Sequence, residues 1–285
     1  MRPAQFDYQR PATIAEAVQV LSGHENAKAL AGGHSLLPAM NLRLAGPDLV
    51  VDIGRISELK GISVKGGSLL IGALATHSQI AASADVQQHC VALASACGKV
   101  GDPHVRNWGT LGGNLAHADP ASDPPTVVIA CDGVIHTQGS GGARSILATE
   151  FFQDLFAVDL HPGELITRVE IPSLGSKKSA YVKMAHPASR YAIVGVCVVL
   201  DMDGGTCKGA SVAVGGATPT ARRSPGAEAA LSGSSLDAAA LDAAANALMG
   251  EIGDVVMGDI FADGVYRRAM AGVYLKRAVH AALAN

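Results

Sequence analysis

The segment that most restricts the fold of this chain is a strand-like run that ends in two glycines and the start of a helix. Residues 27–31 are short and mostly apolar, the sequence Gly-Gly-His-Ser follows at 32–35, and a helical pattern occupies 36–44. Glycines allow positive φ angles and a close approach of the main chain to a ligand. Successive N–H groups in such a turn form a concavity for an anion, and the positive end of the next helix points at the same place. Ser35 can cap that helix or donate to a phosphate oxygen; a tight turn without a ligand explains this segment equally well.

A second glycine-rich segment occupies residues 109–114, with the sequence Gly-Thr-Leu-Gly-Gly-Asn. Thr110 and Asn114 offer hydrogen-bond donors, and Asp123 downstream offers an acceptor. One phosphate needs one such loop, whereas a pyrophosphate with a ribityl or ribose group attached could use both. The alternative is a loop-rich connection made rigid by prolines. Two such segments in one domain favour a ligand-binding site, but they do not name the ligand.

Hydrophobic periodicity predicts an α+β chain whose second part has strands followed by a helical tail. Thr13 and Glu16 have the spacing of a capping box at a helix start. Residues 101–125 show little regular periodicity, and the small, charged run 175–178 is interpreted as a hinge between domains. Helices are expected at 14–21, 36–44, 86–100, 227–231, 238–249 and 264–283, and strands at 27–31, 49–53, 68–73, 165–171, 192–200 and 210–214. The last helix is expected to bury a face made of Val265, Ala269, Gly272, Val273, Lys276 and Val279.

Composition and missing motifs exclude several classes of function. The net charge of −3, from 22 basic and 25 acidic side chains, provides no broad basic field for nucleic acid or an anionic membrane. Five cysteines without a Cys-x-x-Cys pair are expected to be buried, reduced thiols of a cytoplasmic protein. Neither a signal-peptide core nor a membrane-spanning apolar run is found. Rossmann, P-loop, zinc-protease and serine-hydrolase motifs are absent, and no metal cluster or nucleophile is identified.

The order, the separation and the residue types of the two glycine segments, together with an aspartate downstream, form a pattern specific enough to indicate a family. With them, the chain resembles the FAD-binding subunits of the molybdenum hydroxylases from end to end. This family includes the medium subunit of aerobic carbon monoxide dehydrogenase and the flavin domain of xanthine dehydrogenase. The resemblance is also carried by residues 6–11, 31–36, 43–44, 51–53, 71–73, 105–107, 119–120, 162–165 and 266–268.

The resemblance implies a fold and a cofactor. An FAD-binding domain with two α+β subdomains, of the type called PCMH-like, is expected at 1–176, divided at about residue 55. A smaller α+β C-terminal domain is expected at 177–285. The first glycine segment would bind the FAD pyrophosphate, and the second would bind it from the other side. The resemblance assigns these residues to the cofactor: Leu30, Ala31, Gly32, Gly33, His34, Ser35, Leu36, Leu37, Val100, Thr110, Leu111, Gly112, Gly113, Asn114, Asp123, Ile166, Lys183 and Tyr191.

Individual roles follow from the same resemblance. Asp123 would hydrogen-bond polar groups of the cofactor, and Val100 and Ile166 would line its pocket. Lys183 would lie near the flavin ring, where its charge would stabilise the reduced ring. Tyr191 would lie against the isoalloxazine, as in the carbon monoxide dehydrogenase branch, and would limit access to one face.

Two residues depart from the family pattern. Arg190 stands where an aspartate is frequent, which changes the charge expected beside the flavin. Trp108 stands where smaller or basic residues are usual. Simple packing is the preferred interpretation of Trp108, ahead of a side chain that covers the cofactor.

The function implied is that of an oxidoreductase subunit without acid–base chemistry of its own. Substrate would be hydroxylated at a molybdenum–pterin site in a separate large subunit, and electrons would pass through two [2Fe–2S] clusters in a separate small subunit to FAD and then to an external acceptor. The assembly is expected to be a dimer of heterotrimers. The alternatives are a stand-alone FAD-dependent oxidoreductase, for which His34, His104 and His117 are the candidate bases, and an assembly subunit without flavin, against which the intact glycine segments argue. Carbon monoxide, a purine, an aldehyde or an N-heterocycle all stay open as substrate, and the acceptor stays open too.

Overall fold

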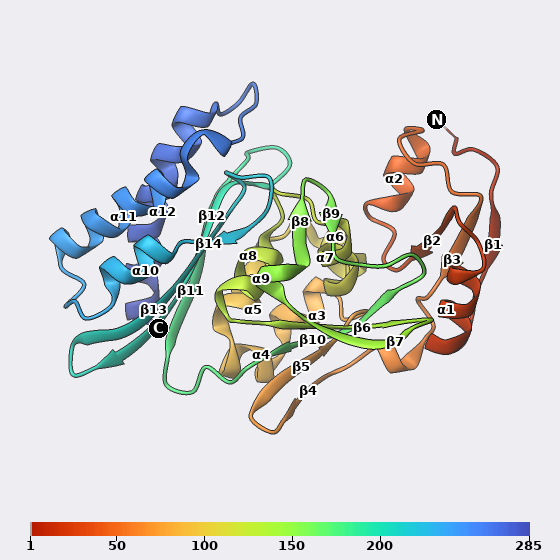
Figure 1. Ribbon diagram of the computed structural model, residues 1–285, viewed down its shortest axis with the longest axis horizontal. Coiled ribbons are helices and arrows are strands. Elements are labelled where there is room, and N and C mark those ends of the chain that lie inside the picture. Colours follow the sequence, from red (N-terminus) through yellow and green to blue (C-terminus); the bar gives the residue numbers. More distant parts are fainter. Residues whose placement is uncertain (1) are drawn as a thin grey trace.

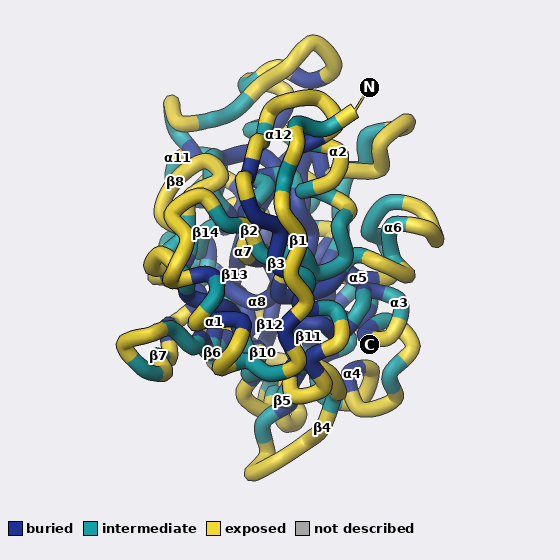
Figure 2. The backbone as a smooth tube through the Cα atoms, turned by 90° about the vertical axis from the view of Figure 1, so that its right-hand side faces the viewer, coloured by how far each residue is buried: buried dark blue, intermediate teal, exposed yellow. Residues whose placement is uncertain are grey.

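The computed structural model describes residues 2–285. A small parallel sheet, a central antiparallel sheet with most of the helices, and a C-terminal antiparallel sheet follow one another along the longest axis of the molecule (Figure 1). Buried backbone gathers toward the middle of the view in Figure 2, and exposed turns lie mostly around its edge.

The N-terminal part is a three-stranded parallel sheet with the order β1-β3-β2. Its elements are β1 (Asp7–Gln9), α1 (Ile14–Ser22), β2 (Ala27–Leu30), α2 (Leu36–Asn41) and β3 (Leu49–Asp52). The central strand β3 is buried, whereas β1 beside it is exposed (Figure 2). In the predicted capping box, the Thr13 hydroxyl accepts from the N–H of Glu16, but the Glu16 carboxylate accepts from the N–H of Ala12 rather than that of Thr13. Helix α2 ends before the predicted residue 44, because Arg43 takes a positive φ of 61°.

The central part is a five-stranded antiparallel sheet with the order β4-β5-β10-β6-β7. Its strands are β4 (Ile62–Lys65), β5 (Ser68–Gly72), β6 (Val134–Gly139), β7 (Gly142–Leu147) and β10 (Leu165–Ile171). Its helices are η1 (Ser57–Leu59), α3 (His77–Ala82), α4 (Ala84–His89), α5 (Val91–Lys99), α6 (Pro103–Trp108), α7 (Leu111–His117), α8 (Asp123–Ala130) and α9 (Ala148–Phe151). A small hairpin joins β8 (Phe152–Asp154) to β9 (Ala157–Val158).

The helices of this part differ in detail from the prediction. The helix expected at 86–100 is divided at Cys90 into α4 and α5. The stretch 101–125, which shows little regular periodicity, contains α6, α7 and the start of α8. These helices are only six to eight residues long, too short for periodicity to be visible, and local signals start them. The Asp102 side chain caps α6, with Pro103 in the first turn, and the Thr110 side chain caps α7.

The C-terminal part is a four-stranded antiparallel sheet with the order β11-β12-β13-β14. Its elements are β11 (Lys178–Ala185), β12 (Ala192–Asp203), β13 (Thr206–Gly215), β14 (Arg222–Arg223), α10 (Pro225–Leu231), α11 (Ala238–Ile252), η2 (Gly253–Val255) and α12 (Gly264–Ala284). Helices α5 and α8 of the central part pack against this sheet, and so do α10 and α12 (Figure 1). Successive side chains of β12 belong to different cores: Cys197 and Val199 to the central core, Val196 and Val198 to the C-terminal core. Burial on both faces explains the continuous apolar run of this strand.

The buried face of α12 differs from the prediction. Val265 is 69% exposed and Val273 is 36% exposed, although both were expected to be buried. The buried residues are Arg267, Ala271, Gly272, Leu275, Ala278, Val279 and Ala282. Arg267 lies on this face because its guanidinium donates to the carbonyl oxygens of Ile193 and Gly216. Within residues 2–285, no helix is both long and apolar enough to cross a membrane.

Candidate functional site

The structure brings the two glycine segments into contact. A Cβ atom on Gly32 would overlap the carbonyl oxygen of Trp108 and lie 3.1 Å from the Cα of Gly109. A Cβ on Gly113 would lie 3.6 Å from the Cβ of Ala31. Gly32 therefore cannot carry a side chain without separating the segments, and glycine is needed there for close approach rather than for an unusual φ.

The first segment presents a row of main-chain donors. Among the described residues, the N–H groups of residues 32–36 donate no hydrogen bond to any other part of the chain. Gly33 has a φ of +74°, and Ser35 stands at the N-cap of α2 without a side-chain cap bond. Buried or half-buried N–H groups are normally paired, so a run of free ones beside a free hydroxyl is suited to an anion. At this segment, Leu37 is 42% exposed, His34 is also exposed, and Leu30, Ala31 and Leu36 are half-buried.

The second segment differs from the loop that was predicted, because residues 111–114 form the first turn of α7. Its N–H groups are already used within the chain. Leu111 donates to Ala75 O (3.0 Å), Gly112 to Ala73 O (2.8 Å), Gly113 to Thr110 Oγ1 (3.2 Å) and Asn114 to Thr110 O (2.9 Å). This segment therefore has no free main-chain donors in its first turn, in contrast to the first segment.

Close packing, rather than space for a phosphate, explains Gly112. A Cβ there would lie 2.6 Å from the Cβ of Ala73 and 2.9 Å from its carbonyl oxygen. The donor that the second segment offers is the side chain of Asn114. Its Oδ1 accepts from the Ser122 hydroxyl at 2.7 Å, and its Nδ2 has no partner among the described residues.

Asp123, the first residue of α8, lies in a buried cluster with Lys183 and Tyr181. Its Oδ2 is 2.8 Å from the Nζ of Lys183, and its Oδ1 accepts from the Tyr181 hydroxyl at 2.5 Å. The Asp123 and Lys183 side chains are 4% and 3% exposed. Burial raises the pKa of Asp123, and the ammonium of Lys183 and the hydroxyl of Tyr181 counteract part of that rise. Both carboxylate oxygens are thus engaged inside the chain.

Lys183 makes two further hydrogen bonds, and a second lysine mirrors it. Its Nζ donates to the carbonyl oxygens of Lys99 (2.9 Å) and Arg190 (2.6 Å). The Nζ of Lys99 in turn donates to the carbonyl oxygen of Tyr181 at 2.8 Å. Neither Lys99 nor Tyr181 was predicted as a site residue from the sequence. A signal existed for Tyr181, because it stands two residues before Lys183 on a strand and so shares its face.

Tyr191 and Arg190 lie in the turn that joins β11 to β12. Tyr191 is 46% exposed. Burial raises the pKa of its phenol, and the charges of Asp119 and Asp123 raise it further. Arg190 is exposed and has a φ of 65°. Trp108 is 65% exposed, which argues against the preferred interpretation of simple packing within this chain.

Three other predicted site residues, Val100, Leu111 and Ile166, are half-buried or buried. Val100 is half-buried after α5, and its carbonyl oxygen accepts from the guanidinium of Arg106 at 3.0 Å. Leu111 and Ile166 are 0% and 5% exposed in the central core, so the structure does not bring these two side chains to the surface.

A buried histidine lies beneath the second segment. The N–H of His77 donates to the carbonyl oxygen of Gly109 at 3.0 Å, and the side chain is 2% exposed. Its Nδ1 is buried and has no hydrogen-bond partner among the described atoms. Burial lowers the pKa of His77 to about 4, with a contribution from the charge of Arg106. No sequence signal distinguished this histidine from the nine others.

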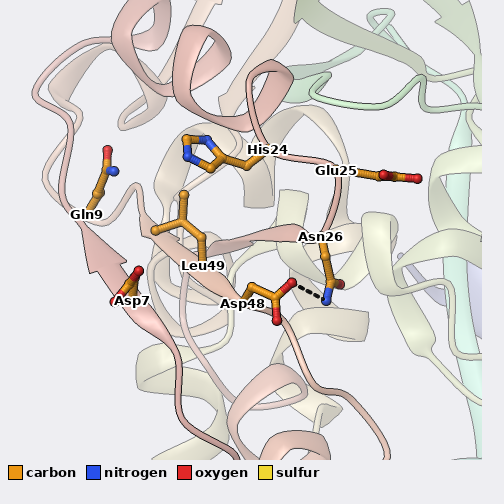
Figure 3. A pocket seen from close by; sticks show the side chains of 7 residues that line it. All are labelled: Asp7, Gln9, His24, Glu25, Asn26, Asp48 and Leu49. Carbon is orange, nitrogen blue, oxygen red and sulfur yellow. Dashed lines mark hydrogen bonds between the residues drawn. The ribbon is translucent and has the colours of Figure 1, made fainter.

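A pocket of about 540 Å³ lies elsewhere (Figure 3). It is lined by Asp7, Gln9, His24, Glu25, Asn26, Asp48 and Leu49. Asn26 and Asp48 precede β2 and β3, whereas the free N–H groups follow the other end of β2. Ligands of parallel sheets bind at the carboxyl ends of the strands. The pocket is at the opposite ends, and its carboxylates would repel a phosphate.

Comparison with known proteins identifies the family. Residues 4–174 match the FAD binding domain in molybdopterin dehydrogenase, and residues 179–282 match the C-terminal domain of the CO dehydrogenase flavoprotein. The chain belongs to the FAD-binding flavoproteins of the molybdenum hydroxylases. The predicted fold class, a two-domain α+β chain, is confirmed, as are the FAD cofactor and the role of an oxidoreductase subunit.

Relatives of this flavoprotein cover its full length. The medium chain of carbon monoxide dehydrogenase from Hydrogenophaga pseudoflava is 36% identical over 100% of this chain and 99% of its own. The nicotine 6-hydroxylase medium subunit of Paenarthrobacter nicotinovorans is 35% identical over 98% of each chain. A solved structure of carbon monoxide dehydrogenase from Hydrogenophaga pseudoflava aligns with a TM-score of 0.95 at 38% identity, covering 100% of this chain and 99% of that one.

Proposed function

We propose that the first glycine segment binds the pyrophosphate of FAD with the main-chain N–H groups of residues 32–36 and the hydroxyl of Ser35. The observation that carries this proposal is the run of unpaired donors after β2, held open by the contact of Gly32 with Trp108. Free N–H groups at a strand-to-helix turn provide the hydrogen-bond donors that a pyrophosphate requires. Bound FAD supplies electron transfer, and the chain supplies binding and orientation.

The second segment contributes to this site in a different way. Its main chain forms the wall against which Gly32 packs, and the side-chain amide of Asn114 is its free donor toward the cofactor. Tyr191 covers the cofactor from the β11–β12 turn, beside Asp119 and Asp123. The remaining residues assigned by resemblance act mainly as the packed support of these groups.

The wider role proposed is that of the electron-transfer subunit of a cytoplasmic complex. Relatives named as medium chains support a small [2Fe–2S] subunit and a large molybdopterin subunit as partners, in a dimer of heterotrimers. Five free, buried cysteines support a reducing compartment. The two family matches support a division into domains near residue 176. Copurification of both partner subunits tests this assembly; a flavoprotein that turns over substrate alone would contradict it.

Substitution of Ser35 tests the pyrophosphate site. Ser35→Ala removes a hydroxyl that has no partner among residues 2–285, so the melting temperature should change little. Loss of a hydrogen bond to a charged phosphate should weaken FAD binding about tenfold to a hundredfold.

Thr13→Ala is the matched control, because the Thr13 hydroxyl does cap a helix. It should lower stability by about 1 kcal/mol and leave FAD affinity unchanged. FAD is titrated into the deflavinated full chain and followed by flavin fluorescence. Equal affinity of Ser35→Ala and the unmodified chain would refute the assignment of Ser35.

A further inference from the structure

The ammonium group of Lys183 has its three donors matched by three acceptors from three different elements. The acceptors are the carboxylate of Asp123 at the start of α8 (2.8 Å), the carbonyl of Lys99 at the end of α5 (2.9 Å) and the carbonyl of Arg190 in the β11–β12 turn (2.6 Å). A lysine has three N–H donors and no acceptor. Lys183 therefore has no donor free for a flavin oxygen unless one of these hydrogen bonds breaks.

The hydrogen bond from Lys183 to the carbonyl oxygen of Arg190 engages a residue with an unfavourable backbone conformation. Arg190 has a φ of 65°, in the left-handed region that non-glycine residues adopt at a cost. Inside the turn, the N–H of Arg190 donates to His186 O (2.9 Å), and the N–H of His186 donates to Tyr191 O (2.8 Å). These local bonds shape the turn, but they do not attach it to the central part of the molecule.

We propose that Lys183 is a positioning residue, which fixes the turn carrying Tyr191 to the ends of α5 and α8 through the carbonyl oxygen of Arg190. Lys99 strengthens the same attachment by donating to the carbonyl oxygen of Tyr181 on β11. The N–H of Ala192, just after the turn, also donates to the carbonyl oxygen of Ala121, just before α8. The consequence for Tyr191 and the flavin rests on the proposed function, whereas the attachment of the turn does not.

Hydrogen exchange in the turn 186–191 tests this attachment in the full chain without FAD. Lys183→Met removes all three bonds and keeps the length of the side chain. Amides of the turn should exchange about tenfold faster or more, while those in the middle of β12 keep their rates. Trypsin should then cleave after Arg190 before other sites. Lys183→Arg, which keeps charge and donors, should restore part of the protection.

Two further variants keep the test decisive. Lys178→Met is the matched control, because that amine donates to Leu283 O at the other end of β11; the turn should exchange as in the unmodified chain. If Lys183→Met alone does not fold, because it leaves Asp123 buried and unpaired, the double variant Asp123→Asn/Lys183→Met removes the orphaned charge. Unchanged exchange of the turn in a folded Lys183 variant would overturn the proposal.

Addition of FAD to the unmodified chain separates positioning from direct flavin contact. If Lys183 keeps its bond to Arg190, the turn exchanges at the same rate or more slowly with FAD. Faster exchange with FAD would show that the amine leaves Arg190 for the flavin, which also overturns the proposal. If FAD does not bind at all, the proposed function fails, and the measurements without FAD still decide the role of Lys183.

Discussion

Burial of His77 makes the stability of the central part depend on pH. Its pKa is about 4 in the folded chain, against an ordinary value of 6.5, because the side chain is buried and the charge of Arg106 adds to the effect. On acidification, the unfolded chain takes up the proton first. Stability is therefore highest above about pH 7, falls as the pH decreases toward about 4, and falls no further from this residue below that value.

The size of this effect follows from the two pKa values. A difference of about 2.5 pH units corresponds to about 3 kcal/mol once both states are protonated. Between about pH 8 and about pH 4.5 the loss from His77 should be about 2–3 kcal/mol. That is a large part of the stability of an ordinary domain, which is about 5–15 kcal/mol.

Urea unfolding at about pH 8 and at about pH 4.5 measures this loss of unfolding free energy. The single tryptophan, Trp108, reports on the part of the molecule that contains His77. His77→Leu removes the titration, and His280→Leu, at an exposed position of α12, is the control. The unmodified chain and the control should lose about 2–3 kcal/mol more than His77→Leu on acidification. An equal loss in all three proteins would refute the reasoning, because the remaining carboxylates are common to them.

Three further predictions concern packing and the buried cluster. Gly112→Ala should lower the free energy of unfolding by about 1–3 kcal/mol in thermal denaturation, because its Cβ would overlap Ala73. FAD affinity should fall only as far as the loss of stability requires, because this Cβ does not block a phosphate. Gly250→Ala, in α11 with nothing within 4 Å of the added Cβ, should instead stabilise by about 0.5–1 kcal/mol. Tyr181→Phe should cost about 1–3 kcal/mol, because Asp123 loses a buried donor; an unchanged urea midpoint would contradict that bond.

Features determined by neighbouring residues could be predicted from the sequence. Strand β10 begins and ends where the apolar run and Pro172 indicated, and the N-cap of α1 lies at Thr13. The strand–glycine–helix pattern of the first segment gave both its geometry and its free donors. The second segment has a similar composition, but its main-chain donors are taken up by residues distant in the sequence. The N–H of Leu111 donates to Ala75 O and that of Gly112 to Ala73 O, just after the end of β5. Glycine content alone could not distinguish a segment with free main-chain donors from a closely packed helix start.

The buried cluster shows a second limit of prediction. Lys183 is separated from Asp123 by 60 residues and from Lys99 by 84, and they meet only because α5 and α8 pack on the C-terminal sheet. Resemblance could place a lysine near the flavin, but it could not show that all its donors are engaged inside the chain. A role carried over from a family therefore needs its hydrogen bonds counted in the structure. At Lys183 that count supports the proposed positioning of the turn that carries Tyr191 over a direct electronic role.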